Sequence, residues 1–235
     1  MVSNTFEGLL TSLYRSHPWH DEPPFVDESE VVNAYIEMVP SDNFKIELNK
    51  FSGHPRVDRP LSFSSRCPSL YGLVPQTYCG KRVAARAAER TGRKRIKGDG
   101  DPLDICVITS DPFYHGDLFV KAIPIGGLPM IDKGQADDKI IAVLEGDVAF
   151  GQVRDIGQLS SPIIERLKHY FLSYKRDFST SSRRQAVRIG AVYGREEALE
   201  VIRLSIADYL AEFGTKKERF EALLQLVADR ANPTC

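Results

Sequence analysis

The sequence predicts an α+β protein that is mainly β, and two patterns carry this prediction. Short apolar or alternating runs bounded by turn residues are typical of strands, and they occur at residues 34–39, 44–48, 105–108, 118–125 and 140–144. Later in the chain, apolar residues recur with the 3.6-residue period of an amphipathic helix, over residues 161–175 and 196–213. We therefore expect a β core with flanking helices. A strand at 186–193 and, after a break at Gly214, a short helix at 215–231 complete the prediction.

The composition excludes several classes of protein. Of the 235 residues, 42% are hydrophobic and 27% are charged, and the net charge is −1, which gives no bulk attraction to nucleic acid or to an anionic membrane. No run approaches the roughly 20 apolar residues of a membrane span. The first ten residues lack the pattern of a secretory signal. The four cysteines have no Cys-x-x-Cys spacing and suit free thiols, so we expect a cytoplasmic protein.

Three carboxylates fall within six residues in the segment Asp99-Gly100-Asp101-Pro102-Leu103-Asp104, directly before the predicted strand 105–108. Its glycine and proline indicate a turn, and a plain surface turn is one explanation. The other is a site for a hard divalent cation such as Mg²⁺ or Ca²⁺, because carboxylates held close together repel one another. An EF-hand is excluded, since the fifth and twelfth positions counted from Asp99 are leucine and serine.

Charged residues also occur in and after the predicted strands of residues 31–59. Alternation places Lys45 and Glu47 on one strand face and three apolar residues on the inward face: Phe44, Ile46 and Leu48. Glu37 lies in the strand before, and Arg59 follows a turn at residues 52–55. Taken alone, these residues indicate no more than solvated strand faces.

Residues 81–97 form a strongly basic segment, with eight Lys or Arg residues and one acid, Glu89. The alanines at 84–88 favour helix. Three interpretations stand: a solvated loop, a contact for nucleic acid, or attraction of an anionic substrate. The segment has no interleaved aromatic residues for base stacking, which argues against nucleic acid.

In their order along the chain, these residues resemble the active-site pattern of family I soluble inorganic pyrophosphatases, over about residues 30–213. Further matches are Tyr71, an acidic loop and the end of the predicted helix 161–175, which supply Asp132, Asp137, Lys139, Tyr174 and Lys175. One position departs from the family: Cys67 stands before Pro68 where the family has a tyrosine. Cys67 is either a small buried residue or a reactive thiol at the rim of the site.

The resemblance implies an OB-type closed five-stranded β-barrel with flanking helices. It also implies a single domain over residues 1–235, with a core of about 30–213, a basic insertion of about 76–98, an N-terminal arm (1–29) and a C-terminal extension (214–235). We expect Trp19 to pack the arm onto the body. Family members form dimers or hexamers, so a homo-oligomer is expected.

The implied activity is Mg²⁺-dependent hydrolysis of inorganic pyrophosphate to two orthophosphates, which would drive biosynthetic reactions that release pyrophosphate. Asp101 would be the general base, and several Mg²⁺ ions would be held by Asp99, Asp104, Asp132, Asp137 and Glu47. Substrate would be held by Lys45, Arg59, Tyr71, Lys139, Tyr174 and Lys175. Glu37 would be a further active-site residue. Acidic residues outnumber basic ones in this set, so a polyanion needs divalent cations to enter. No Ser, Cys or His nucleophile competes, so water is expected to attack directly.

Overall fold

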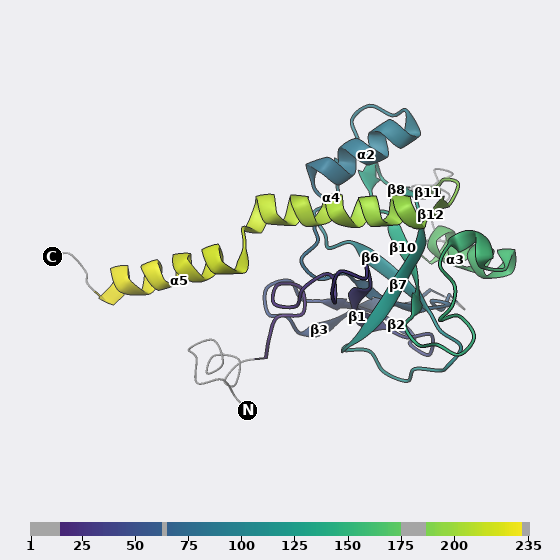
Figure 1. Cartoon of the computed structure of the whole chain (residues 1–235), viewed down its shortest axis with the longest axis horizontal. Helices are drawn as coiled ribbons and strands as arrows, with labels where there is room; N and C mark the ends of the chain where they lie inside the picture. The colour runs from purple at the N-terminus through teal and green to yellow at the C-terminus, as the bar shows by residue number, and fades with distance from the viewer. Residues whose placement is uncertain (1–14, 63–64, 175–186, 232–235) are drawn as a thin grey trace.

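The computed structural model describes residues 15–62, 65–174 and 187–231, and its centre is a closed β-barrel (Figure 1). Five strands pair in the order β1 (Val32–Met38), β4 (Leu70–Leu73), β6 (Asp104–Ile108), β10 (Lys139–Leu144) and β7 (Leu118–Leu128). β7 then pairs with β1 and closes the barrel. β6 and β10 run parallel, whereas the other neighbours are antiparallel. The predicted mainly β fold with an OB-type five-stranded barrel is confirmed.

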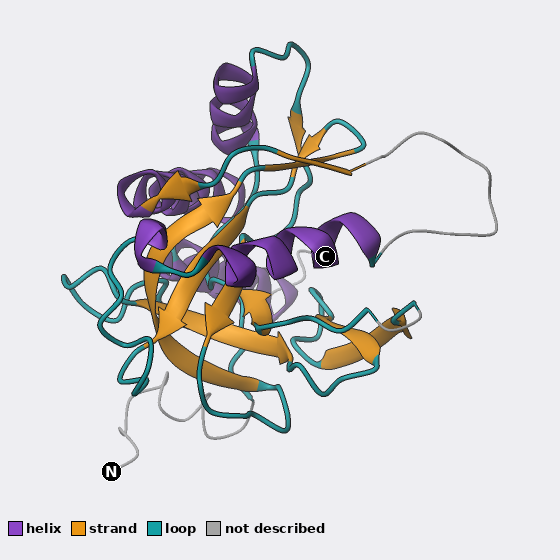
Figure 2. Cartoon of the chain, turned by 90° about the vertical axis from the view of Figure 1, so that its right-hand side faces the viewer, coloured by secondary structure: helices purple, strands orange, loops and turns teal. Residues whose placement is uncertain are grey.

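Two smaller sheets accompany the barrel. A hairpin is formed by β2 (Phe44–Leu48) and β3 (Pro55–Pro60). The second sheet has the order β11 (Val187–Ile189), β8 (Met130–Asp132), β9 (Gln135–Ala136) and β5 (Lys97–Gly98). Figure 2 shows the hairpin and this sheet as separate groups of strands, on either side of the helix that ends at the grey segment. Both sheets therefore stand beside the barrel rather than in its wall.

The strand predicted over residues 186–193 is wrong in its extent, and its first residue lies outside the described residues. The chain forms two short strands instead, β11 and β12 (Tyr193–Gly194). β11 pairs with β8, whereas β12 pairs with β7 of the barrel. Between them Gly190 N donates to Pro129 O at 2.9 Å. A switch from one sheet to another requires this interruption, and strand propensity does not reveal it.

The helices follow the predicted order. They are α2 (Lys81–Thr91), the 3₁₀ turn η1 (Ile156–Gln158), α3 (Ser161–Ser173), α4 (Arg195–Phe213) and α5 (Lys216–Ala231). Gly214 ends α4 with a φ of +69°, a conformation that favours glycine, which confirms the predicted break. Beyond this break, α5 extends away from the body (Figure 1). None of the helices in the described ranges is long and apolar enough to cross a bilayer.

The hydrophobic core lies inside and around the barrel because strands such as β1 and β10 are covered on both faces. Val32, Ile36, Ile105 and Ile140 are fully buried in one cluster. Phe44, by contrast, was expected to point inward and is 49% exposed. β2 belongs to the hairpin, and the core covers the face shared by Phe44, Ile46 and Leu48 only toward Leu48, which is 6% exposed. The alternation was predicted correctly, but Phe44 is the first residue of β2 and lies outside the buried part of this face.

Trp19 anchors the start of the described chain. Its side chain is 3% exposed, and its indole Nε1 donates to Thr77 O at 2.8 Å. The ring packs edge-on against Tyr209 and Phe213 of α4. The predicted packing of Trp19 onto the body is confirmed.

The basic segment contains a helix, α2, that packs on α4. Arg82 pairs with Asp208 at 3.1 Å, and Arg86 and Arg90 both pair with Glu197. The α2 N-terminus has no side-chain cap of its own. The carboxylate of Asp208 supplies one, accepting from three backbone amides: Gly80 N, Arg82 N and Val83 N. The interpretation of this part as a solvated loop is therefore wrong, since its charges meet acids from a distant part of the sequence.

Candidate active site

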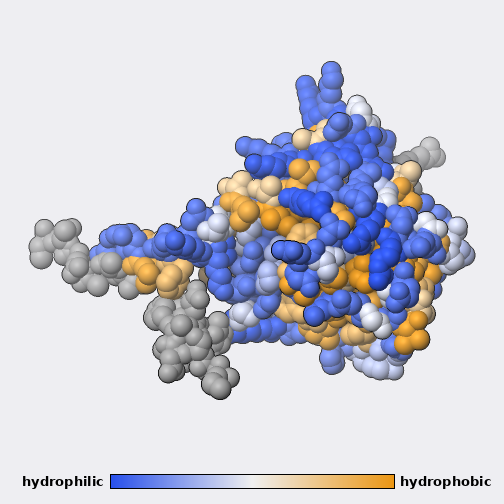
Figure 3. Space-filling model, in the orientation of Figure 1, coloured by the Kyte–Doolittle hydropathy of each residue, from blue (hydrophilic) through white to orange (hydrophobic). Residues whose placement is uncertain are grey.

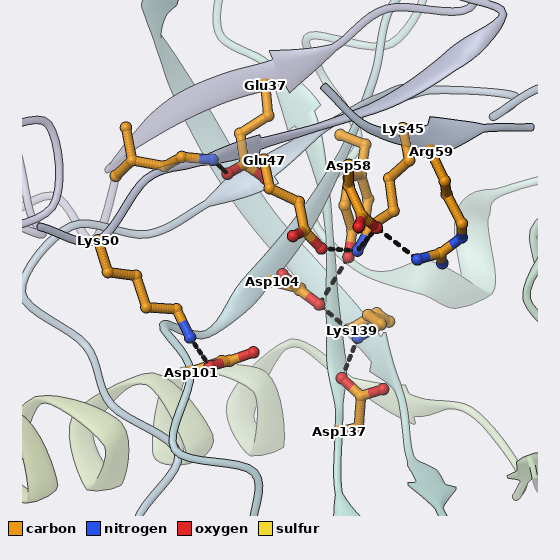
Figure 4. A network of polar contacts seen from close by, with 12 residues as sticks. Glu37, Lys45, Glu47, Lys50, Asp58, Arg59, Asp101, Asp104, Asp137 and Lys139 are labelled. Carbon is orange, nitrogen blue, oxygen red and sulfur yellow. Dashed lines mark hydrogen bonds and ion pairs between the residues drawn. The ribbon is translucent and has the colours of Figure 1, made fainter. Parts of the chain in front are cut away.

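A cavity of about 260 Å³ collects most of the residues singled out from the sequence. Eleven of them line it: Glu37, Lys45, Glu47, Tyr71, Asp99, Asp101, Asp104, Asp132, Asp137, Lys139 and Tyr174. Arg59 lies beside this set, next to Lys45 in Figure 4. Lys175 falls outside the described residues. The side chains come from strands and loops far apart in sequence, so the barrel is what brings them together.

The loop before β6 is shaped by close backbone contacts. A side chain at Gly98 would place its Cβ 1.9 Å from Cys79 O, so only glycine fits there. Cys79 N donates to Asp101 O at 2.8 Å, and Asp101 N donates to Asp99 Oδ1 at 3.0 Å. Gly100, with a φ of +77°, allows the turn between the two acids. The Asp-Gly-Asp order thus builds a fixed turn at the edge of the cavity.

Asp104 and Lys139 lie opposite each other, at the first positions of the parallel strands β6 and β10. Lys139 Nζ donates to Asp104 Oδ2 and to Asp137 Oδ1 (Figure 4). Tyr71 OH donates to the same Asp104 oxygen at 2.6 Å. Lys139 is only 1% exposed. Burial alone would lower its pKa, but the charges of Asp104 and Asp137 outweigh burial and raise the pKa well above its usual value. The centre of the cavity therefore holds a permanent ammonium group.

Two other acids show how crowded with negative charge the cavity is. Burial, together with the charge of Asp137, raises the pKa of Asp99 to about 8. Burial also raises the pKa of Glu37 to about 8, although Leu48 N donates to its Oε1 at 2.6 Å. Carboxyl groups with such pKa values keep their protons at neutral pH unless further positive charge arrives. The site is thus short of positive charge.

The donor set fits a hard divalent cation by its chemistry, because the acidic lining offers only carboxylate oxygens, the ligands that Mg²⁺ and Ca²⁺ prefer. As the side chains stand, no three acidic, His or Cys groups among the described residues converge as metal ligands. The ammonium groups explain this arrangement. Lys139 engages Asp104 and Asp137, and Lys50 engages Asp101 (Figure 4). A bound cation would compete with these lysines for the same oxygens.

The β2–β3 hairpin contributes the basic side of the site. Lys45 pairs with Glu47 and lies 3.9 Å from Asp58, which in turn pairs with Arg59. Burial lowers the pKa of Lys45. The Arg59 guanidinium lies over the Tyr174 ring, 5.9 Å from its centroid. Lys45, Arg59 and Tyr174 therefore form one wall of the site, where the positively charged side chains of Lys45 and Arg59 can contact a phosphate.

Three polar residues at the described site were not predicted. Lys50 and Gln135 line the cavity, and Asp58 bridges Lys45 and Arg59. Asp58 stands next to a predicted residue, but strict alternation places it on the other strand face. The pairing of β2 with β3 shifts register between Lys45 and Ile46, and a shift of this kind is not visible in the sequence. Lys50 follows β2 in a turn, where composition gives no signal.

Cys67 lies in the interior and not at the rim. It is 1% exposed, it belongs to the core cluster around β4 and α3, and burial raises its pKa to about 11. Its Sγ lies 3.8 Å from Ser69 Oγ. Of the two interpretations drawn from the sequence, the structure supports the small buried residue.

A closed barrel with carboxylates at one cavity, and with lysines and an arginine beside them, defines a class of protein: β-barrel enzymes that act on phosphate groups with divalent cations. Comparison with known proteins narrows the class. The family "Inorganic pyrophosphatase" matches residues 34–210. An inorganic pyrophosphatase of Chlamydia caviae is 44% identical over 208 residues, which is 88% of this chain and 96% of that protein.

Comparison with solved structures also finds inorganic pyrophosphatases. A pyrophosphatase of Thermus thermophilus aligns with a TM-score of 0.66 at 27% identity, covering 83% of this chain and 99% of that one. A type I inorganic pyrophosphatase of Toxoplasma gondii aligns with a TM-score of 0.69 at 26% identity, covering 86% and 91%. The chain belongs to the inorganic pyrophosphatase family.

Proposed function

We infer that the chain is an inorganic diphosphatase, which hydrolyses inorganic pyrophosphate to two orthophosphates and thereby drives reactions that release pyrophosphate. One observation carries the inference beyond family membership. The five aspartates of the two acidic loops line a single cavity together with Lys45 and Lys139. A pyrophosphate anion requires that combination: oxygens for cations, and cations for phosphate.

The family is metal-dependent, and we propose Mg²⁺, several ions per site, as the metal. Asp99, Asp104, Asp132, Asp137 and Glu47 would hold it. When bound, such ions neutralise phosphate charge and make the attacking water more acidic. The raised pKa of Asp99 supports this assignment, because a cation in the cavity would let that carboxyl ionise.

In the proposed reaction, Asp101 takes a proton from the water as its oxygen attacks one phosphorus atom. The bridging P–O bond breaks, and its electron pair leaves with the second phosphate. Asp101 lies at the open side of the cavity, with its side chain 51% exposed, and its partner Lys50 is equally accessible. The phosphates would be held by Lys45, Arg59, Tyr71, Lys139, Tyr174 and Lys175, and Glu37 would complete the site as a largely protonated acid. No protein nucleophile takes part.

The test is release of phosphate from pyrophosphate by the purified chain, with and without millimolar Mg²⁺, between pH 6 and 9. Turnover that requires the metal is expected. Protein that leaves pyrophosphate intact across this range would overturn the proposal. Binding of single-stranded nucleic acid is not expected, because Arg82, Arg86 and Arg90 are engaged by acids of α4.

We further propose a cytoplasmic homo-oligomer in which residues 1–235 form one domain: a core at about 30–213, an insertion at about 76–98, an arm at 1–29 and an extension at 214–235. The extension supports self-association, because α5 carries apolar residues that are about half exposed: Leu223, Leu224 and Leu226. Figure 3 shows apolar surface on α5. Light scattering on the intact chain tests this, and a monomer at micromolar concentration would contradict it.

A further inference from the structure

A second hollow, of about 640 Å³, lies beside α2 and shares no lining residue with the active-site cavity. Its walls come from α2, from β8 and from the chain around β11. We call it the α2 groove. Apolar residues of the lining include Ala87, Pro129, Ile131 and Ile189, and four arginines stand among them: Arg86, Arg90, Arg93 and Arg188. The volume falls within the range of sites for small ligands, roughly 300–1,000 Å³.

Both acids of the α2 groove are already engaged. Glu197 accepts from Arg86 at 2.8 Å and also pairs with Arg90. Asp138 is 7% exposed, and its oxygens accept from Met130 N and from Tyr193 OH, each at 3.1 Å. These acids therefore neutralise no other arginine of the groove.

Two guanidinium groups of the α2 groove remain uncompensated. Arg93 follows α2, and Arg188 is the central residue of β11; both are exposed. Within the ranges that the structure describes, neither forms an ion pair with a carboxylate. Guanidinium groups bind phosphate oxygens through paired N–H donors and also stack on planar rings. An apolar floor beside two such groups suits a ligand with one charged and one flat end.

We propose that the α2 groove binds a nucleoside mono- or diphosphate, with the phosphate on Arg93 and Arg188 and the base against the apolar floor. The groove lies on strands that also carry the active site. Ile131 lies in the groove and directly precedes Asp132. Asp138 lies between Asp137 and Lys139. A ligand that shifts β8 or the start of β10 moves the acids of the cavity, so occupancy changes the rate of the proposed pyrophosphate hydrolysis, on which this part of the inference rests.

Binding of ADP and AMP to the metal-free chain, measured by titration calorimetry, tests the proposal. Leaving out divalent metal prevents recruitment of nucleotide through the acidic cavity. We expect one site with submillimolar affinity that methylenediphosphonate, a pyrophosphate analogue directed at the active site, does not displace. Arg93→Ala and Arg188→Ala should each weaken binding about tenfold, the worth of one charged hydrogen-bonded contact.

Lys94→Ala is the matched control. Lys94 is an exposed cation of the same segment and does not line the α2 groove, so ADP binding should stay unchanged. Absence of binding at several millimolar ADP, displacement by methylenediphosphonate, or an equal loss in Lys94→Ala would each overturn the proposal. Equal affinity for ADP and inorganic phosphate would overturn the nucleoside part. Because binding is measured without turnover, a chain without pyrophosphatase activity would still give a clear answer.

Discussion

Tyr71 OH and Asp104 Oδ2 are 2.6 Å apart, and the same carboxylate oxygen accepts from Lys139. Two donors on β4 and β10, the strands on either side of β6, thus converge on one oxygen of β6. Their convergence fixes the direction of the Asp104 carboxylate before any ligand arrives. The Tyr71 ring is 6% exposed and packs near Phe171, so the hydroxyl has little freedom to leave.

Tyr71→Phe should lower kcat/KM for pyrophosphate by about tenfold, since one hydrogen bond to a charged group is lost while the ring keeps its packing. Tyr170→Phe is the control, because among the described residues the Tyr170 hydroxyl has no hydrogen-bond partner although its ring is also buried. Steady-state kinetics and the thermal midpoint of both variants give the answer. The same loss of activity in Tyr170→Phe would refute a specific role for the Tyr71 hydroxyl.

Asp104→Asn and Asp101→Asn should separate a metal ligand from a general base. Asp104→Asn is expected to weaken Mg²⁺ binding and turnover together, because a carboxylate at the centre of the cavity loses its charge. Asp101→Asn should lower kcat by roughly 10²–10⁴-fold with little change in metal affinity. The apparent Mg²⁺ affinity and kcat of each variant both follow from rates measured over a Mg²⁺ titration. An equal loss of metal affinity in both variants would show that the base is not Asp101.

Asp208→Ala should cost about 1–3 kcal/mol in the free energy of unfolding, the usual effect of removing a helix cap and leaving buried amide donors without an acceptor. Asp208 is 4% exposed, and its loss leaves Arg82 and the first amides of α2 without their acceptor. Urea denaturation measures the effect. Glu212→Ala, which removes an exposed acid near the end of the same helix, should stay within about 0.5 kcal/mol of the wild type. A loss below 1 kcal/mol in Asp208→Ala would contradict the capping role.

Protonation of His20 should lower stability as the pH falls from 6.5 toward 4, whereas Asp99 and Glu37, whose pKa values are raised to about 8, act in the opposite direction over the same window. Burial lowers the pKa of His20 to about 4, against 6.5 for a free histidine. The unfolded chain therefore binds a proton in this window that the folded chain does not, which favours unfolding as the pH falls. Relative to the wild type, the urea midpoint of His20→Gln should shift toward higher stability as the pH is lowered through 6.5, 5.5 and 4.5, because the contribution of His20 is removed. His54→Gln, at an exposed turn, is the control, and an unaltered slope in His20→Gln would refute the assignment.

Local pattern was enough to predict the Asp-Gly-Asp turn and four of the five barrel strands, all except β4, because alternation and turn chemistry act over a few residues. The order of the charged residues indicated the family, and the family resemblance in turn predicted the closed barrel. Contacts between distant segments were not predictable. The sequence around Arg82 does not indicate that Asp208 is its partner, and the sequence around Asp101 does not indicate Lys50. Phe44 shows the same limit, since alternation along β2 does not reveal that the core covers this strand face only toward Leu48.

The pairing of β1 with β7 joins strands that are far apart in sequence, and it closes the ring from which Glu37, Tyr71, Asp104 and Lys139 project. Amide protons along this seam, such as that of Ala34, can exchange with solvent only when the ring opens, and opening disperses the site. Ligand that binds only the closed ring should slow hydrogen exchange at the seam by the full factor 1 + [L]/Kd. Exchange in α5, outside the ring, should not respond. Binding at one cavity thereby protects backbone amides along the whole closed barrel.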